Sequence, residues 1–312
     1  MATALITHPA CLGHVTPDGH PERVARLAAV LKALRTEEFR LLTWLEAPEA
    51  SREGLAAVHS PELVAFLIDE AGRKAGEGFV GIDADTVLSK GSIAAALRAA
   101  GAVQRAIDGV MAGEFINAFC PIRPPGHHAE RDRAMGFCLF NNVAIGAHHA
   151  RVMHGLKRIA VIDFDVHHGN GTQDIFQGDA DLFYASTHQS PLYPGTGRAS
   201  EHGVAGNIVN APLPSGADGE SFRAAFRDAI LPALAGFAPD FVLISAGFDA
   251  HKRDPLAQLA LDETDFGWAT KEICAVAGKA CSGRVVSALE GGYDLEALAA
   301  SSAAHVRALM EA

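Results

Sequence analysis

Two aspartates and a histidine alternate in the stretch DFDVHHGNGT, residues 163–172. Asp163, Asp165 and His167 have the same parity, and alternate side chains of an extended segment point to the same face. The stretch follows the apolar run 159–162, so the chain passes from a buried strand directly into acidic and imidazole side chains. Because unpaired carboxylates are costly to bury, we expect a cation to bind here.

Asp249 follows another apolar run, 241–246, and completes a candidate ligand set with Asp165 and His167. Three protein ligands with an open fourth position are typical of a catalytic zinc site. Carboxylate and imidazole ligands also suit ferrous iron or cobalt, and the sequence does not choose among these metals. The alternative is that these side chains cap helices or turns, as Asp and His beside glycines often do.

Further side chains with acid–base chemistry lie in loops. His127 and His128 follow a stiff Pro-Pro-Gly turn, and a histidine is a natural general base for activating a metal-bound water. Asp163 is the candidate to orient one of them. Tyr293 follows two glycines and could donate a hydrogen bond to a developing oxyanion, although such a tyrosine is more often a packed ring in a turn. For the other histidines of the helical and C-terminal segments we expect no role and a solvated position: His148, His149, His154 and His305.

Apolar runs alternate with helical patterns along the chain, which is typical of a parallel α/β sheet. Four runs are the clearest strands: 114–119, 158–164, 241–246 and 284–290. Each is followed directly by one of the unusual stretches, and ligands bind at the carboxyl edge of such sheets. We predict helix starts at Ser60, Ser92 and Asp294, and a long loop over 186–220 at the rim of the site.

Bulk properties limit the class of protein. The chain has 312 residues and a formal net charge of −11; we expect one domain over residues 1–312. The charge opposes nucleic-acid binding and favours the approach of cationic ligands. No run is long enough for a membrane span. Five cysteines without C-x-x-C spacing and no signal-peptide pattern at the start predict free thiols and a cytoplasmic location. A homo-oligomer is compatible with the sequence.

These motifs together resemble the zinc-dependent histone deacetylase family, in its class II and bacterial amidohydrolase branch. The resemblance runs from residue 20 to 294 and rests on HPERVARL, RPPGHHA, GFCLFNNVAIGA, DFDVHHGNGTQDIF, YPGTG, SAGFDAH and LEGGYD. It implies the arginase/deacetylase fold, an α/β domain with a central, mostly parallel sheet of eight strands and helices on both faces.

The resemblance also implies residue roles. One zinc ion per chain would be held by Asp165, His167 and Asp249. The catalytic group would be His127 paired with Asp163, His128 paired with Asn170, and Tyr293. Some relatives carry an aspartate in place of Asn170, so His128 would be the less basic ring. The tunnel for the acyl-lysine would be lined by Phe137, Tyr193, Gly136, Gly291 and Gly292. A structural potassium ion would lie near Asp163, Asp165, His167, Ser186 and Thr187, and Arg26 would lie near a cavity for acetate.

The implied reaction is hydrolysis of acetyl amides, first of all acetyl-lysine in proteins or peptides. A metal-activated water would attack, the tandem histidines would act as base and acid, and Tyr293 would polarise the carbonyl. Three alternatives remain: an acetylpolyamine amidohydrolase with Asp83 and Asp85 at the rim, an arginase-like binuclear metal hydrolase, and a non-catalytic acyl-lysine-binding module. Gly169 stands where an arginase-like site has a further aspartate, which favours one metal.

Overall fold

Eight strands form one parallel sheet in a computed structural model that describes residues 2–312. Their order across the sheet is β2 (Thr43–Glu46), β1 (Thr3–Thr7), β5 (Asn117–Cys120), β10 (Val285–Leu289), β9 (Phe241–Ala246), β6 (Ile159–Asp163), β7 (Leu182–Gln189) and β8 (Ile208–Leu213). The expected α/β fold with a parallel eight-stranded sheet is therefore confirmed. All four strands identified in the sequence are present, and they are neighbours at the centre of the sheet.

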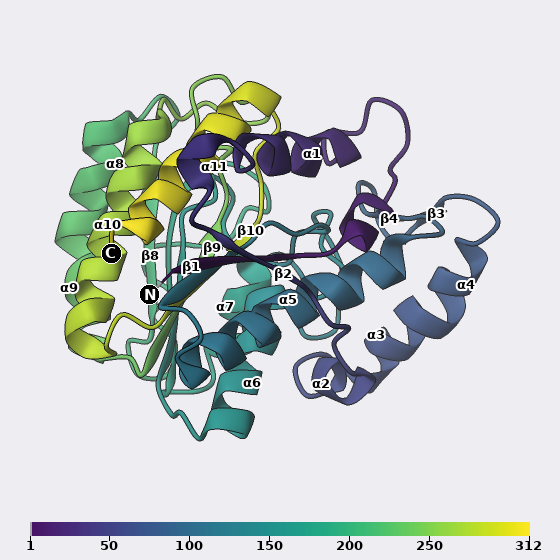
Figure 1. Cartoon of the computed structure of the whole chain (residues 1–312), viewed down its shortest axis with the longest axis horizontal. Helices are drawn as coiled ribbons and strands as arrows, with labels where there is room; N and C mark the ends of the chain where they lie inside the picture. Colours follow the sequence, from purple (N-terminus) through teal and green to yellow (C-terminus); the bar gives the residue numbers. More distant parts are fainter. Residues whose placement is uncertain (1) are drawn as a thin grey trace.

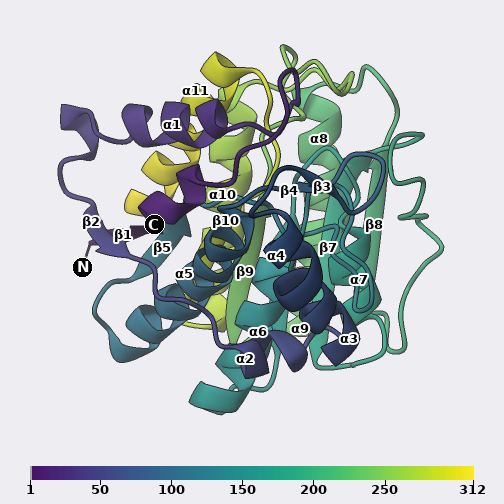
Figure 2. The ribbon, with the colours of Figure 1, turned by 90° about the vertical axis from the view of Figure 1, so that its right-hand side faces the viewer.

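Helices cover both faces of this sheet (Figures 1 and 2). On one face lie α1 (Val24–Ala33), α10 (Glu263–Ala280) and α11 (Leu295–Met310), which pack against one another. On the other, α5 (Ser92–Ala112) packs against α6 (Asn142–His154) and against the central strands. Because both faces are covered, the central strands are buried along their whole length and read as continuous apolar runs.

Shorter elements complete the chain. They are the helices α2 (Arg52–Ala56), α3 (Pro61–Ala65), α4 (Gly72–Lys74), α7 (Asn170–Phe176), α8 (Gly219–Ala225) and α9 (Leu231–Phe237), the π-helical turns Phe66–Ala71 and Phe226–Ile230, the 3-10 turns Pro9–Leu12 and Glu37–Phe39, and a two-stranded ribbon of β3 (Val80–Gly81) and β4 (Val87–Leu88). None of the helices within residues 2–312 combines the length and the apolar character needed to cross a bilayer.

Helix starts follow the capping chemistry that the sequence indicated. The Ser60 hydroxyl accepts a hydrogen bond from the Leu63 amide at the start of α3, and Asp294 does the same for Ala297 at the start of α11. α5 begins at Ser92, as predicted. The Asp294 cap starts α11 directly after Tyr293.

The prediction of one long loop over residues 186–220 is wrong. The end of β7 and all of β8 lie within it, and α8 begins at Gly219. β8 forms the edge of the sheet and contains Pro212, which an edge strand tolerates because one row of its amides needs no partner. Proline, glycine and asparagine around β8 hid the strand. The remainder, which includes Tyr193, does reach the rim of the site.

His305 is also misplaced by the sequence analysis, because it is fully buried rather than solvated. Its ring lies between α10 and the sheet, with Nδ1 2.7 Å from the Thr270 hydroxyl and Nε2 2.7 Å from the Ser287 hydroxyl. The rings of Phe119, Phe164 and Phe248 pack around it. A histidine can join the core in this way because both of its nitrogens find partners.

Candidate active site

Asp165, His167 and Asp249 come together in the loops that follow β6 and β9. His167 Nδ1 lies 3.1 Å from a carboxylate oxygen of Asp165 and 3.1 Å from one of Asp249. All three side chains are buried. Two buried carboxylates facing one imidazole form a donor set that suits a divalent cation. Zinc binds carboxylate oxygens and imidazole nitrogens in proteins.

Glycines hold space for these carboxylates. A Cβ atom on Gly291 would lie 2.0 Å from Asp249 Oδ2 and 2.6 Å from Asp165 Oδ2, and one on Gly247 would lie 2.0 Å from Asp165 Oδ2. The Gly291 amide also donates to Asp165 Oδ2 at 2.8 Å. The backbone after β10 therefore closes directly onto the carboxylates, so these residues fit a metal ion between them.

The tandem histidines lie beside this triad with separate partners. His127 Nδ1 is 3.0 Å from Asp163 Oδ2, and its Nε2 is 3.9 Å from Asp165 Oδ1. His128 Nδ1 is 2.8 Å from Asn170 Oδ1, and the two rings are 4.0 Å apart. Both predicted pairings are therefore present, and each ring has one nitrogen fixed and the other available.

Burial and nearby charges shift the pKa values of His127 and His128 in opposite directions. Burial favours a neutral His127, but Asp165 and Asp163 offset this and raise its pKa to about 10. Burial and the positive charges of His127 and His167 hold the pKa of His128 well below its usual value. His128, whose ring is paired with the Asn170 amide, is thus the less basic of the two histidines. The sequence analysis expected the same order of basicity.

A pocket of about 230 Å³ leads to these side chains. Two of its lining residues are His167, a candidate metal ligand, and His128, the candidate base. The others are Gly136, Phe137, Tyr193, Tyr293, Asp85, Leu192 and Leu256. Gly136 and Phe137 both have positive φ, and a Cβ atom on Gly136 would lie 2.5 Å from the His128 ring. Only glycine allows this loop to pass so close to the histidine.

Tyr293 closes one wall of the pocket, and Arg26 lies behind it. Burial raises the pKa of the Tyr293 phenol well above its usual value despite the nearby Arg26 charge, so the phenol keeps its proton at neutral pH. The Arg26 guanidinium is 4.8 Å from the centre of the tyrosine ring and donates to the carbonyls of Glu290 and Gly292. Gly292 belongs to the loop that positions Tyr293 rather than to the lining of the pocket itself.

Ser186 and Thr187 lie in the second half of β7, next to β6. Ser186 is paired with Asp163 across the two strands. The hydroxyl of Thr187 is buried and has no hydrogen-bond partner among the described residues. The residues expected around a potassium ion are therefore neighbours.

Several contributors to the site carried no signal that the sequence analysis used. Tyr184 donates to Asp163 Oδ2 and accepts from the Gly169 amide, but a tyrosine within a strand looks like any core residue. Glu290, inside the quoted LEGGYD, accepts from the amides of Gly126 and His127 and so holds the histidine loop. Leu192 and Leu256 line the pocket from loops with no distinctive pattern.

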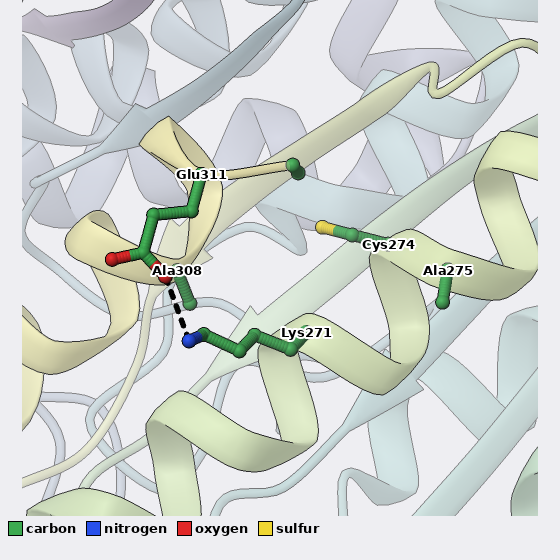
Figure 3. Close-up of a pocket in the computed structure, with 6 residues that line it drawn as sticks. Lys271, Cys274, Ala275, Ala308 and Glu311 are labelled. Carbon is green, nitrogen blue, oxygen red and sulfur yellow. Dashed lines mark ion pairs between the residues drawn. The ribbon is translucent and has the colours of Figure 1, made fainter.

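Another hollow, of about 330 Å³, lies between α10 and α11 and takes no part in this site. It is lined by Cys274 and by the ion pair of Lys271 with Glu311, 2.7 Å apart (Figure 3). Its lining has no cluster of metal ligands or paired histidines. Size alone therefore does not identify the functional pocket; the chemistry of the lining does.

Comparison with known proteins places this geometry in a family. A model of the histone deacetylase domain matches residues 20–309. The chain belongs to the histone deacetylase family. Histone deacetylase 14, chloroplastic, of Arabidopsis thaliana is 42% identical, over 96% of this chain and 75% of that protein. A probable deacetylase of Archaeoglobus fulgidus is 42% identical, over 95% of this chain and 82% of that protein.

A solved structure supports the same family assignment. The crystal structure of the HDA15 HD domain superposes with a TM-score of 0.92 at 34% identity, covering 99% of this chain and 88% of that one. The present chain therefore has the histone deacetylase fold. It is a hydrolase, a deacetylase.

Proposed function

We propose that this deacetylase removes acetyl groups from lysine side chains in proteins or peptides, and that residues 1–312 form one catalytic domain. The observation that carries the proposal is the pocket itself. Phe137 and Tyr193 wall it, His128 and His167 line it, and Asp165 and Asp249 contact His167. The aromatic and aliphatic side chains of its walls suit the alkyl chain of an acylated lysine.

One zinc ion per chain would be held by Asp165, His167 and Asp249. When bound there, zinc polarises the amide carbonyl and makes water acidic enough to be a nucleophile at neutral pH. The remaining steps belong to side chains. The Tyr293 phenol donates to the carbonyl oxygen as negative charge develops on it.

Hydrogen bonding around His128 supports its role as the proton acceptor. Asn170 Nδ2 donates to Glu130 at 2.6 Å, so its Oδ1 accepts from His128 Nδ1–H. This leaves His128 Nε2 with a free lone pair, and the ring lines the pocket. His127, bound to Asp163, carries positive charge beside it and supports transfer of a proton to the departing amine.

A potassium ion beside the catalytic metal is a second element of the proposal. It would be held by backbone carbonyls around Asp163, Asp165 and His167 together with Ser186 and Thr187. The unpartnered Thr187 hydroxyl supports this assignment. As a monovalent charge beside Asp163, the ion would help to fix the loop that carries the metal ligands. The position of Arg26, beneath the Tyr293 loop, is compatible with the predicted acetate cavity.

An acetylpolyamine is the second candidate substrate, and one observation favours it. Asp85 lines the pocket, and Asp83 accepts from the backbone of the same turn. Carboxylates at the mouth of the pocket could hold a secondary ammonium group. A binuclear arginase-like site is disfavoured, because a Cβ atom on Gly169 would lie 2.4 Å from Asp163 Oδ2. A non-catalytic module would have no use for the paired histidines.

We also infer a reducing, cytoplasmic location, because all five cysteines are free and buried. The plant relative named above is chloroplastic by name, so the compartment of this chain is best tested directly by fractionation of the cells that express it.

A paired turnover assay tests the substrate. Protein stripped with a chelator and then reloaded with zinc is given an acetyl-lysine peptide and an acetylpolyamine in parallel. We expect faster release of acetate from the peptide. Faster release from the polyamine would make an acetylpolyamine the substrate. No activity on either compound after zinc is restored would overturn the proposed function.

A further inference from the structure

Away from the active site, two histidines share one aspartate oxygen on the outer side of the α5–α6 pair. His149 Nε2 lies 2.6 Å and His154 Nε2 2.7 Å from Asp108 Oδ1. Asp108 belongs to α5, and both histidines belong to the C-terminal half of α6. The sequence analysis expected these histidines to be solvated and without a role, but their side chains are only 15% and 22% exposed.

The three side chains converge closely enough to bind one ion. One ligand atom from each lies within 4.8 Å of the others. Ligand atoms around a tetrahedral zinc ion are about 3.3 Å apart, so each histidine needs to withdraw from Asp108 by only about 0.6 Å. Asp108 is 44% exposed, which leaves it free to make this adjustment and leaves room for water as a further ligand.

The tautomers available to the two histidines also permit metal binding. In the present arrangement each imidazole presents Nε2 to the carboxylate, and no hydrogen bond within residues 2–312 uses either Nδ1. A neutral histidine can move its proton to Nδ1 and offer the Nε2 lone pair to a metal. Each ring would keep its proton on Nδ1, and the ion would lie where the two Nε2–H groups now face Asp108.

The surroundings favour a cation. The histidines lie toward the C-terminal end of α6, where the helix dipole is negative. The nearby arginines in sequence are engaged elsewhere, Arg105 with Glu114 at 2.5 Å and Arg151 with Asp179 at 2.6 Å. Neither of these guanidinium groups therefore neutralises Asp108 directly.

We propose that Asp108, His149 and His154 form a second metal site, separate from the catalytic one. Two imidazoles and one carboxylate with open positions suit zinc or another first-row divalent ion of similar ligand preference. Because its ligands come from two helices, the ion would tie α5 to the end of α6. The site would stabilise this layer of the fold and take no part in deacetylation.

Zinc binding to the full chain tests the proposal. Protein already loaded at its tight catalytic site is dialysed against increasing Zn²⁺, and bound zinc is measured. We expect about two ions per chain for the unaltered protein and about one for Asp108→Asn or His154→Gln. His148→Gln is the matched control: it removes a neighbouring imidazole of the same helix and should keep both ions.

Thermal unfolding gives a second readout. Zinc at about a hundred times the dissociation constant of the weaker site should raise Tm by about 4 °C. That rise should be absent in Asp108→Asn, which should still deacetylate because Asp108 lies outside the catalytic machinery. One ion per chain in the unaltered protein, or a second ion retained by both Asp108→Asn and His154→Gln, would overturn the second site without touching the proposed function.

Discussion

At the scale of single residues, Tyr293 provides the sharpest test of the proposed reaction. Replacing Tyr293 by Phe keeps the ring that packs near Phe137 and Arg26 but removes the donor to the carbonyl. Loss of one oxyanion donor lowers kcat by about 100- to 1,000-fold. Steady-state kinetics with zinc-loaded protein would measure this. Unchanged turnover, with an unchanged zinc content, would mean that the phenol is not part of the reaction.

Gly291 tests the metal site through its backbone. Gly291→Ala would place a methyl group against the carboxylates of Asp249 and Asp165, so we expect weaker zinc binding and a loss of kcat/KM of about 100-fold. Gly278→Ala is the control, since a Cβ atom there meets nothing within 4 Å in α10. The control should keep full zinc content and be slightly more stable. Equal zinc content in both variants would contradict the assigned ligands.

At the scale of elements, α11 contributes a buried histidine to its packing against α10 and the sheet, and this histidine makes stability depend on pH. Burial lowers the pKa of His305 to about 3. Between about pH 6.5 and pH 3, His305 is therefore protonated in the unfolded chain and neutral in the folded chain. Stability is full well above that window and falls as the pH drops through it, by about 2.3 kcal/mol between pH 6.5 and 4.5.

Denaturant unfolding of His305→Gln at these two pH values would isolate this contribution. We expect the variant to lose about 2–3 kcal/mol less than the unaltered protein on acidification, whatever its stability at pH 7. His59, with a pKa lowered by burial to about 4, would contribute equally in both proteins and so cancels. The same acid sensitivity in both proteins would show that His305 is not buried as a neutral ring.

The elements could be predicted from the sequence in proportion to how fully they are buried. The central strands β5, β6, β9 and β10 are buried throughout and mostly apolar, and the candidate site residues follow them directly, so both the strands and the candidate site could be predicted. The edge strand β8 was not, because an edge tolerates Pro212 and polar neighbours. Partners such as Tyr184, or the burial of His305, depend on contacts between distant segments, which no local pattern encodes.

At the scale of the whole molecule, the net charge of −11 predicts a dependence on salt. A cationic substrate is drawn toward an acidic protein, and salt screens that attraction beyond about 10 Å at 0.1 M. For an acetyl-lysine peptide flanked by lysines, kcat/KM should fall by about 3- to 10-fold between low and high ionic strength. A matched peptide flanked by glutamates should show no such fall. Equal salt dependence of the two would rule out electrostatic steering.

The order of strands in the sheet has a consequence for biosynthesis. β10 lies between β5 and β9, yet it is the last strand to leave the ribosome. Until it inserts, the strand carrying the histidine loop has no neighbour on that side, and the Gly291 amide that holds Asp165 is missing. A nascent chain would therefore carry all three proposed metal ligands without a finished site. The ability to hold the catalytic metal should arrive in one step, with the final strand, so unfinished chains would neither sequester zinc tightly nor act on acetyl groups.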